Sequence, residues 1–258
     1  MTTKVVILQS YDEVSSFAAN KVLKLINSNS KAVIGLPTGS TPLGMYKELV
    51  NMYKQGLVSF QNVTTFNLDE YIGLSPDDKN SYHYYMYENF YKHVNVGEIN
   101  INIPNGKALD LEQECRDYEH KIKTAGGIDL MLLGLGVNGH IGFNEPGPLF
   151  SPVTHSIDLD KSTIEANARF FKSISEVPTS ALTMGIGSIM RSRRVLLLAT
   201  GDSKKVAVKN SLQGPVTPQV PASVLQLHSN ATFLLDKDAA SLLELPGHIE
   251  CTLYGKLK

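Results

Sequence analysis

The sequence predicts an α/β fold in which a mostly parallel sheet carries helices on both faces. Short apolar runs of strand length alternate with longer amphipathic segments along all 258 residues, which is the strand-helix rhythm of a parallel sheet. The run at residues 128–133 is apolar almost throughout, as expected for a strand covered on both faces. No repeat, low-complexity tract or linker interrupts the pattern, so we expect residues 1–258 to form a single domain.

The elements follow from the length and period of these runs. We expect strands at residues 4–8, 32–36, 63–68, 128–133, 181–186, 195–199 and 232–235, with extended pieces at 99–103 and 154–159. We expect helices at residues 11–26, 43–53, 81–94 and 111–125, from Asp160 as N-cap through 171, from the motif at 201–204 to 212, and briefly from 238. In the helix at 81–94, Tyr82, Met86 and Phe90 form one stripe, and helical spacing favours core packing over base stacking.

Composition excludes several classes of protein. Hydrophobic content is 42%, charged content 19% and net charge −1, which is typical of a soluble globular chain. Basic residues are scattered, so no nucleic-acid partner is expected, and the cluster of Arg191, Arg193 and Arg194 is interpreted as a solvated corner between a helix and a strand. Cys115 and Cys251 form neither a disulfide framework nor a zinc motif. Residues 1–10 contain too few apolar residues for the core of a signal peptide, and no apolar window approaches the length of a membrane span. We therefore expect a cytoplasmic protein.

Four polar motifs come directly after predicted strands. Because the carboxyl ends of parallel strands share one edge of the sheet, we expect these motifs to outline one pocket. They are PTGSTP at 37–42, DEY at 69–71, the glycine-rich stretch at 133–147 and GDSK at 201–204.

The first motif offers the backbone N–H groups and hydroxyls of Gly39, Ser40 and Thr41 at a helix start, where an anion is favoured. The lysine and glycine spacing of a nucleotide-triphosphate loop is missing, so a phosphate monoester fits better. An ordinary Ser-Thr cap with Pro42 near the first turn is the alternative.

Asp69 and Glu70 are adjacent in an extended segment. Successive side chains alternate, so one carboxylate should face the pocket, where it could act as a base beside a carbonyl or imine carbon. Spacing does not tell which one, and a solvated acidic strand end is the alternative.

The stretch at 133–147 combines a predicted Asn138-Gly139 turn with glycines at 134, 136, 139 and 142, which we expect to adopt positive φ. His140 and Glu145 could form a dyad, with Asn138 adding a positioning hydrogen bond. A loop histidine bonded to backbone is the alternative. The chain lacks HExxH and GxSxG motifs, so neither a catalytic metal nor serine hydrolysis is expected.

These motifs resemble those of the glucosamine-6-phosphate deaminase family. The matching segments, which occur in the family's order over nearly the whole chain, are LPTGSTPLGMYKEL, FNLDEYIGL, SYHYYMYENF, LGLGVNGHIGFNEPG, EANARFF and ALTMGIGSIM. The resemblance implies a Rossmann-like fold and conversion of glucosamine 6-phosphate and water to fructose 6-phosphate and ammonia, with no cofactor.

The resemblance also implies roles for individual residues. Asp69 is similar to the base that moves a proton from C2 to C1 of the opened sugar. His140 resembles the acid/base of ring opening, oriented by Glu145. Arg169 and Lys204 resemble the phosphate partners, alongside the loop of Gly39, Ser40 and Thr41.

Two departures from the family pattern stand out. Asn138 occupies a position that is aspartate in some members, so Glu145 is expected to be the only anionic partner of His140, with a changed pH profile for ring opening. Some relatives are hexamers activated by N-acetylglucosamine 6-phosphate through basic residues, but residues 148–159 contain no Lys or Arg. We therefore expect no such activation, while a monomer and a homo-oligomer both remain open.

Two alternatives remain. A 6-phosphogluconolactonase-like hydrolase would share the fold and bind a similar sugar phosphate, but the DEY motif and the NGHIGFNEP segment favour the deaminase. A non-catalytic sugar-phosphate sensor would need an attached DNA-binding segment, which we do not expect because the first predicted strand starts at residue 4.

Overall fold

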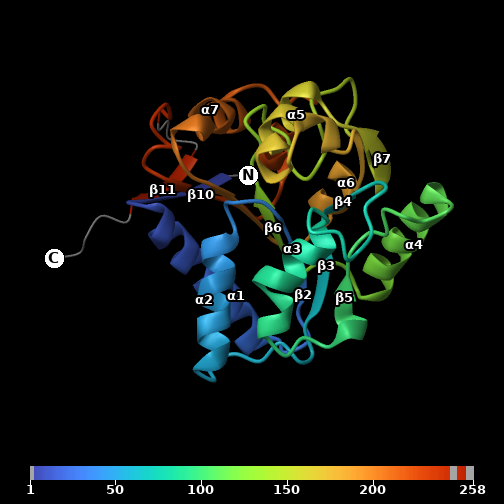
Figure 1. Ribbon diagram of the computed structural model, residues 1–258. Helices are drawn as coiled ribbons and strands as arrows, with labels where there is room; N and C mark the ends of the chain where they lie inside the picture. Colours follow the sequence, from blue (N-terminus) through green and yellow to red (C-terminus); the bar gives the residue numbers. More distant parts are fainter. Residues whose placement is uncertain (1–2, 245–248, 254–258) are drawn as a thin grey trace.

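A parallel sheet of eight strands forms the centre of the computed structural model, which describes residues 3–244 and 249–253 (Figure 1). Every strand pair recorded in this sheet is parallel. In spatial order the strands are β11 (Ile249–Leu253), β1 (Thr3–Leu8), β10 (Ala231–Asp236), β9 (Val195–Ala199), β6 (Leu130–Gly134), β2 (Val33–Leu36), β3 (Thr64–Asn67) and β5 (Ile101–Asn102). The predicted α/β fold with a mostly parallel sheet is confirmed.

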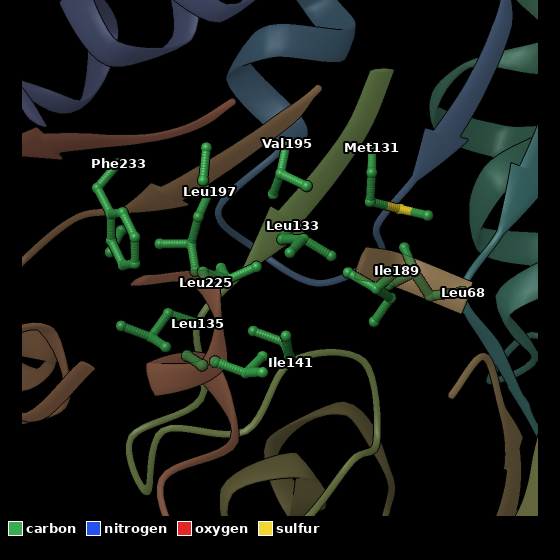
Figure 2. Close-up of a cluster of buried hydrophobic side chains, with 14 of the residues drawn as sticks. Leu68, Met131, Leu133, Leu135, Ile141, Ile189, Val195, Leu197, Leu225 and Phe233 are labelled. Carbon is green, nitrogen blue, oxygen red and sulfur yellow. The ribbon is translucent and has the colours of Figure 1, made fainter. Parts of the chain in front are cut away.

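Both faces of this sheet are covered by helices, because its strands send apolar side chains alternately to two cores. Val6 and Leu8 join a cluster with α1 (Tyr11–Ser28), α2 (Leu43–Lys54) and α3 (Tyr82–Asn89). Val5 and Ile7 join the opposite cluster, to which α4 (Leu111–Thr124), α6 (Ile186–Met190) and α7 (Lys205–Gln213) contribute. Figure 2 shows this second core on one face of β6, β9 and β10, where labelled side chains such as Leu133 and Leu197, which are register partners, lie side by side.

A second, antiparallel sheet stands beside the carboxyl end of β3. It has the order β4 (Asp69–Tyr71), β8 (Ser180–Thr183) and β7 (His155–Asp158), and it pairs Asp69 with Thr183. The DEY motif therefore forms a strand of its own, whereas the sequence pattern had placed it simply at the end of the preceding strand. Helix α5 (Lys161–Asn167) follows β7 directly, and Asp160 caps it as predicted, accepting a hydrogen bond from the Ser162 amide at 2.8 Å.

Several predicted elements have different bounds or a different nature. The helices expected at 81–94 and 161–171 end earlier and continue as 3₁₀ turns, Tyr91–His93 and Ala168–Phe170. The strand at 181–186 is too long, since α6 begins at Ile186. The helix expected from 238 is wrong: residues 237–242 form turns, because the Asp236 carboxylate accepts the Ala239 amide at 2.8 Å and bends the chain. Strand β11, which pairs with β1 at the sheet edge, was not predicted.

The connections reverse direction between β2 and β6, which lie side by side. After β2 the chain continues to β3 and β5 on one side, and after β6 it continues to β9 and β10 on the other. Such a switch point leaves a crevice outside the carboxyl ends of the strands. The polar motifs lie at this crevice.

The remaining sequence-level features have structural roles. The arginine cluster lies at the corner between α6 and β9, as predicted, where Arg191 pairs with Glu119 at 3.1 Å and Arg193 with Asp129 at 2.6 Å. Cys115 is a buried free thiol, while the side chain of Cys251 lies outside the described part of the chain. Among the residues described, no helix is both long and apolar enough to cross a membrane.

Candidate active site

A cavity of about 670 Å³ opens at the switch point, and segments after β2, β3, β6 and β9 line it together with α5. Most residues predicted from the sequence are brought together here: Gly39, Ser40, Thr41, Asp69, His140, Arg169 and Lys204 all line the cavity. Asn138 and Glu145 do not line it, because they lie behind His140 and contact it from there. The four polar motifs thus meet at one site.

Three tyrosine hydroxyls hold the carbonyl groups of the PTGSTP loop. Tyr46 donates to Pro37 O at 2.6 Å, and Tyr85 donates to Gly39 O at 2.6 Å. The hydroxyl of Tyr11 donates to the carbonyl of the next residue along the loop at 3.3 Å. With these carbonyls already bound, the backbone N–H groups of the loop remain as donors for an anion at the start of α2.

The cap of α2 distinguishes the two interpretations of this loop. Pro42 is the N-cap residue and makes no side-chain capping bond, so the ordinary Ser-Thr cap is wrong. Gly39 has a φ of +93° with open space where a side chain would begin, which leaves the loop backbone accessible to a ligand in the cavity.

Two cations also line the cavity. In the described structure neither Arg169 nor Lys204 has an ion-pair partner. Burial lowers the pKa of Lys204, and the Arg169 charge nearby lowers it further. The loop that carries Lys204 is anchored where the Gly201 amide donates to both Asp236 oxygens, at 3.0 and 2.9 Å. Two cations without an ion-pair partner, in a cavity that the PTGSTP loop also lines, suit a phosphate dianion.

The acidic pair on β4 divides into two environments. Glu70 turns away toward α3 and accepts the amides of Tyr71, Tyr82 and His83 at 2.8, 2.9 and 2.9 Å. Burial raises the pKa of Glu70 to about 7, although these three hydrogen bonds act in the opposite direction. Glu70 therefore caps a helix, and the other carboxylate, Asp69, lines the cavity. The alternative interpretation of this pair as a solvated acidic strand end is wrong, because both side chains are buried.

Asp69 has no comparable set of donors. Its Oδ1 atom is buried without a hydrogen-bond partner, and burial, followed by the Glu70 charge, raises the pKa of Asp69 to about 8. Gly142 packs against it with a φ of +57°: a Cβ at this position would lie 2.9 Å from Thr183 Oγ1 and 3.5 Å from Asp69 Oδ2. The loop is fixed there because Thr183 Oγ1 accepts the Phe143 amide at 3.0 Å.

His140 and Glu145 form the dyad proposed from their spacing. His140 Nδ1 lies 3.2 Å from Glu145 Oε2. Burial alone would raise the pKa of Glu145, but the hydrogen bond and charge of His140, with bonds from Thr163 and Asn138, hold it below its usual value. The imidazole ring contacts Glu145 and Thr163 rather than backbone, so the backbone-bonded loop histidine is wrong.

Asn138 uses both ends of its amide. Its Nδ2 donates to Glu145 Oε2 at 2.9 Å, and its Oδ1 accepts the His140 amide at 3.2 Å. The positioning hydrogen bond predicted for Asn138 is therefore present, and the group that faces Glu145 is a donor.

Only two of the four glycines in this loop adopt the positive φ that was predicted, Gly139 and Gly142. Gly136 is required for space instead, because a Cβ would lie 2.4–2.5 Å from atoms of the His140 ring. Gly134 simply ends β6.

Sequence reasoning missed several cavity residues, among them Thr163 and Asn167 on α5. Neither belongs to a polar motif after a strand, so spacing gave no signal. The stripe on α3 is partly as predicted: Met86 and Phe90 pack in the core, but Tyr82 lines the cavity and stacks on Phe143 with ring centroids 5.8 Å apart.

Comparison with known proteins agrees with this site. The family model for glucosamine-6-phosphate isomerases/6-phosphogluconolactonase matches residues 9–234. The chain is 55% identical over 240 residues to a glucosamine-6-phosphate deaminase of Thermoanaerobacter sp. (strain X514), covering 93% of this chain and 95% of that one. It is 52% identical to the Clostridium acetobutylicum deaminase, covering 93% and 100%.

Solved structures give the same result. A monomeric glucosamine-6-phosphate deaminase is 50% identical and superposes with a TM-score of 0.91, covering 93% of this chain and 100% of that one. The 6-phosphogluconolactonase from Trypanosoma brucei, at 22% identity and a TM-score of 0.70 over 94% and 99% of the two chains, shares the fold. The chain therefore belongs to the family of glucosamine-6-phosphate isomerases and 6-phosphogluconolactonases.

Proposed function

We propose that this protein is a glucosamine-6-phosphate deaminase, which converts glucosamine 6-phosphate and water to fructose 6-phosphate and ammonia. One observation carries the proposal: a buried carboxylate without donors, Asp69, and a histidine-carboxylate pair open onto the same cavity as two unneutralised cations. The deaminases at 50–55% identity support it. The cavity volume of about 670 Å³ is ample for a hexose phosphate.

The substrate phosphate is proposed to bind between Arg169, Lys204 and the loop of Gly39, Ser40 and Thr41. Both cations lack an ion-pair partner among the residues described. A dianion would raise the pKa of Lys204, which burial and the Arg169 charge lower. This anchor fixes one end of the sugar and leaves its reactive carbons toward the other end of the cavity.

His140 is proposed to open the sugar ring. With Nδ1–H donated to Glu145, the other ring nitrogen, Nε2, is free to take the anomeric hydroxyl proton and deliver it to the ring oxygen. The negative charge of Glu145 stabilises the imidazolium that forms between these transfers. The product of this step is the open-chain aldehyde, from which the enolamine forms when a second proton, the one on C2, is removed.

Asp69 is proposed to perform that second transfer. Its carboxylate removes the C2 proton, and the electron pair of that bond forms the C1–C2 double bond while the π pair of the C1 carbonyl moves to O1, which takes a proton from solvent. The proton held by Asp69 then returns to C1, and the nitrogen lone pair forms the C2=N bond. The resulting C2 iminium group is then attacked by water, which leaves the ketone and releases ammonia. A carboxylate with few hydrogen-bond donors is a stronger base than one in water, consistent with the raised pKa of Asp69, about 8.

The deciding experiment compares two reactions of the wild-type protein. We expect ammonia release from glucosamine 6-phosphate and no acceleration of 6-phosphogluconolactone hydrolysis. Lactone hydrolysis without ammonia release would favour the 6-phosphogluconolactonase alternative, and binding of glucosamine 6-phosphate without either reaction would favour a sensor.

We further propose that the protein is a monomer, that it is located in the cytoplasm, and that its small-molecule partner is glucosamine 6-phosphate. The solved deaminase at 50% identity is described as monomeric, and we expect sedimentation of this chain to give the monomer mass. Simple hyperbolic kinetics, unchanged by N-acetylglucosamine 6-phosphate, are expected; a sigmoidal substrate dependence that this ligand abolishes would contradict them.

A further inference from the structure

Thr163 is a buried residue on a helix whose other face is exposed. Only 4% of Thr163 is accessible to solvent, and its Oγ1 lies 3.4 Å from His140 Nδ1. Helix α5 thereby reaches the histidine-glutamate pair from the side opposite to the glycine-rich loop that carries it. A β-branched alcohol at such a position costs helix propensity and burial of a hydroxyl, so its contacts are informative.

The hydrogen on His140 Nδ1 determines whether the Thr163 hydroxyl donates or accepts. Glu145 Oε2 is the closer partner of His140 Nδ1, at 3.2 Å, so that nitrogen carries the hydrogen and Thr163 can only accept from it. The hydrogen of the Thr163 hydroxyl is then left for Glu145, and this hydrogen bond is one of the contacts that hold the pKa of Glu145 below its usual value.

The segment that carries Thr163 also carries the phosphate end of the cavity. Arg169 follows six residues later in the 3₁₀ turn that continues α5, a separation of roughly 9 Å along a helix. Asn167, between them, donates to the Tyr71 hydroxyl at 3.0 Å, and Phe171, just after Arg169, packs edge-on against the Tyr71 ring. Residues 161–171 are thereby tied to β4, the strand of Asp69.

We propose that Thr163 is a positioning residue for ring opening: its hydroxyl completes the hydrogen bonds of the Glu145-His140 pair and joins that pair to the segment that carries Arg169. The inference rests on the proposed deaminase function. A phosphate held by Arg169 would keep α5 in place, and α5 in turn would keep the imidazole aimed at the sugar ring. The side chain itself exchanges no proton with the substrate.

The test compares Thr163→Val, which keeps the shape and removes the hydroxyl, with Thr163→Ser, which keeps the hydroxyl. We expect kcat/KM for ammonia release to fall about tenfold in the valine variant, as for loss of one hydrogen bond to a charged group, and to return to within roughly twofold of wild type in the serine variant. Thr154→Val is the matched control, because Thr154 is equally buried, with 4% of its surface exposed, and its hydroxyl donates to Glu119 Oε1 at 2.7 Å. Neither of these two residues lines the cavity. Its kcat/KM should equal that of wild type.

A second measurement separates positioning from a general disturbance of the site. The linear 2-amino-2-deoxyglucitol 6-phosphate has no ring to open, so Thr163→Val should bind it as tightly as wild type does. Unchanged kcat/KM in Thr163→Val, an equal loss in the serine variant or in Thr154→Val, or weakened binding of the linear compound would each overturn the inference. Wild type is measured in parallel: if it releases no ammonia, the proposed function fails, whereas an active wild type with an equally active valine variant overturns only the role of Thr163.

Discussion

Asp69 lines the cavity and is held by strand β4, whereas Glu145 lies behind His140 and is held by the side chains of a loop. Each side chain has one buried oxygen without a hydrogen-bond partner, Asp69 Oδ1 and Glu145 Oε1, but the other oxygen of Glu145 accepts from Asn138 and His140. Burial raises the pKa of Asp69 to about 8, while the donors around Glu145 outweigh burial and lower its pKa.

For these two side chains, the hydrogen-bond donors around Glu145 and the charge of His140 account for the opposite directions in which the two pKa values move. A carboxylate kept without donors is basic and suits proton abstraction, and one supplied with donors is a fixed anion that orients a histidine. Glu70, adjacent to Asp69, adds a third case, since its three backbone donors turn it into a helix cap. The following predictions test this division of roles.

The largest effect is expected for Asp69→Asn. An amide of the same shape cannot accept the C2 proton, so ammonia release should fall by about a thousandfold. Exchange of the C2 hydrogen with deuterated solvent, followed by NMR, should stop as well. Persistent exchange would move the base elsewhere, with Glu70 as the first residue to test.

The same variant should change how stability depends on pH. Burial raises the pKa of Asp69 in the folded protein from its ordinary value of 3.8 to about 8, so the neutral side chain stabilises the fold fully below pH 4 and that stability is lost as pH rises toward 8. Relative to Asp69→Asn, the wild type should therefore lose on the order of 4 kcal/mol of unfolding free energy between pH 4 and 9. Urea unfolding of both proteins across this range measures the difference, and parallel curves would contradict the environment described for Asp69.

Glu70→Gln should give the opposite pattern to its neighbour. Glutamine presents one oxygen and one NH₂ group to amides that all need acceptors, so α3 loses part of its cap and stability should fall by about 2 kcal/mol. Ammonia release should stay within roughly fivefold of wild type, since Glu70 does not line the cavity. Initial rates should therefore be lost mainly in Asp69→Asn, and thermal unfolding should show the loss of the helix cap in Glu70→Gln. A Glu70→Gln variant that is stable but inactive would reverse the assignment.

Local sequence signals predicted the frame of this site well. Strand periodicity located the parallel sheet, and polar motifs after strands located Asp69, His140 and Lys204 at one edge, because a strand determines where its next residues emerge. The spacing of His140 and Glu145 was sufficient to propose their contact, since both lie in one short loop.

Contacts between distant segments could not be predicted in this way. The Tyr85 hydroxyl reaches Gly39 O across 46 residues, and Thr163 reaches His140 across 23. Alternation along the strand predicted that Asp69 and Glu70 point in opposite directions, but not which of them faces the cavity. The amides that bind Glu70 belong to a helix that begins at Tyr82, which the local pattern does not place. The separate strand β4 depends in the same way on pairing with β8, more than a hundred residues later.

The smallest expected effect concerns Asn138→Asp, which tests whether a donor is required beside Glu145. The substitution would place a carboxylate oxygen where Nδ2 now lies, 2.9 Å from Glu145 Oε2. Repulsion between two carboxylates raises the pKa of Glu145 in the folded protein, so the variant should be stable at low pH and lose about 1 kcal/mol relative to wild type as pH rises to 8. Asn138→Leu is the control, because it removes the same hydrogen bonds without adding charge and its deficit should be equal at pH 5 and 8. If urea unfolding shows the aspartate variant equally weakened at both pH values, the cost comes from lost geometry, and the charge of Glu145 does not depend on the amide of Asn138.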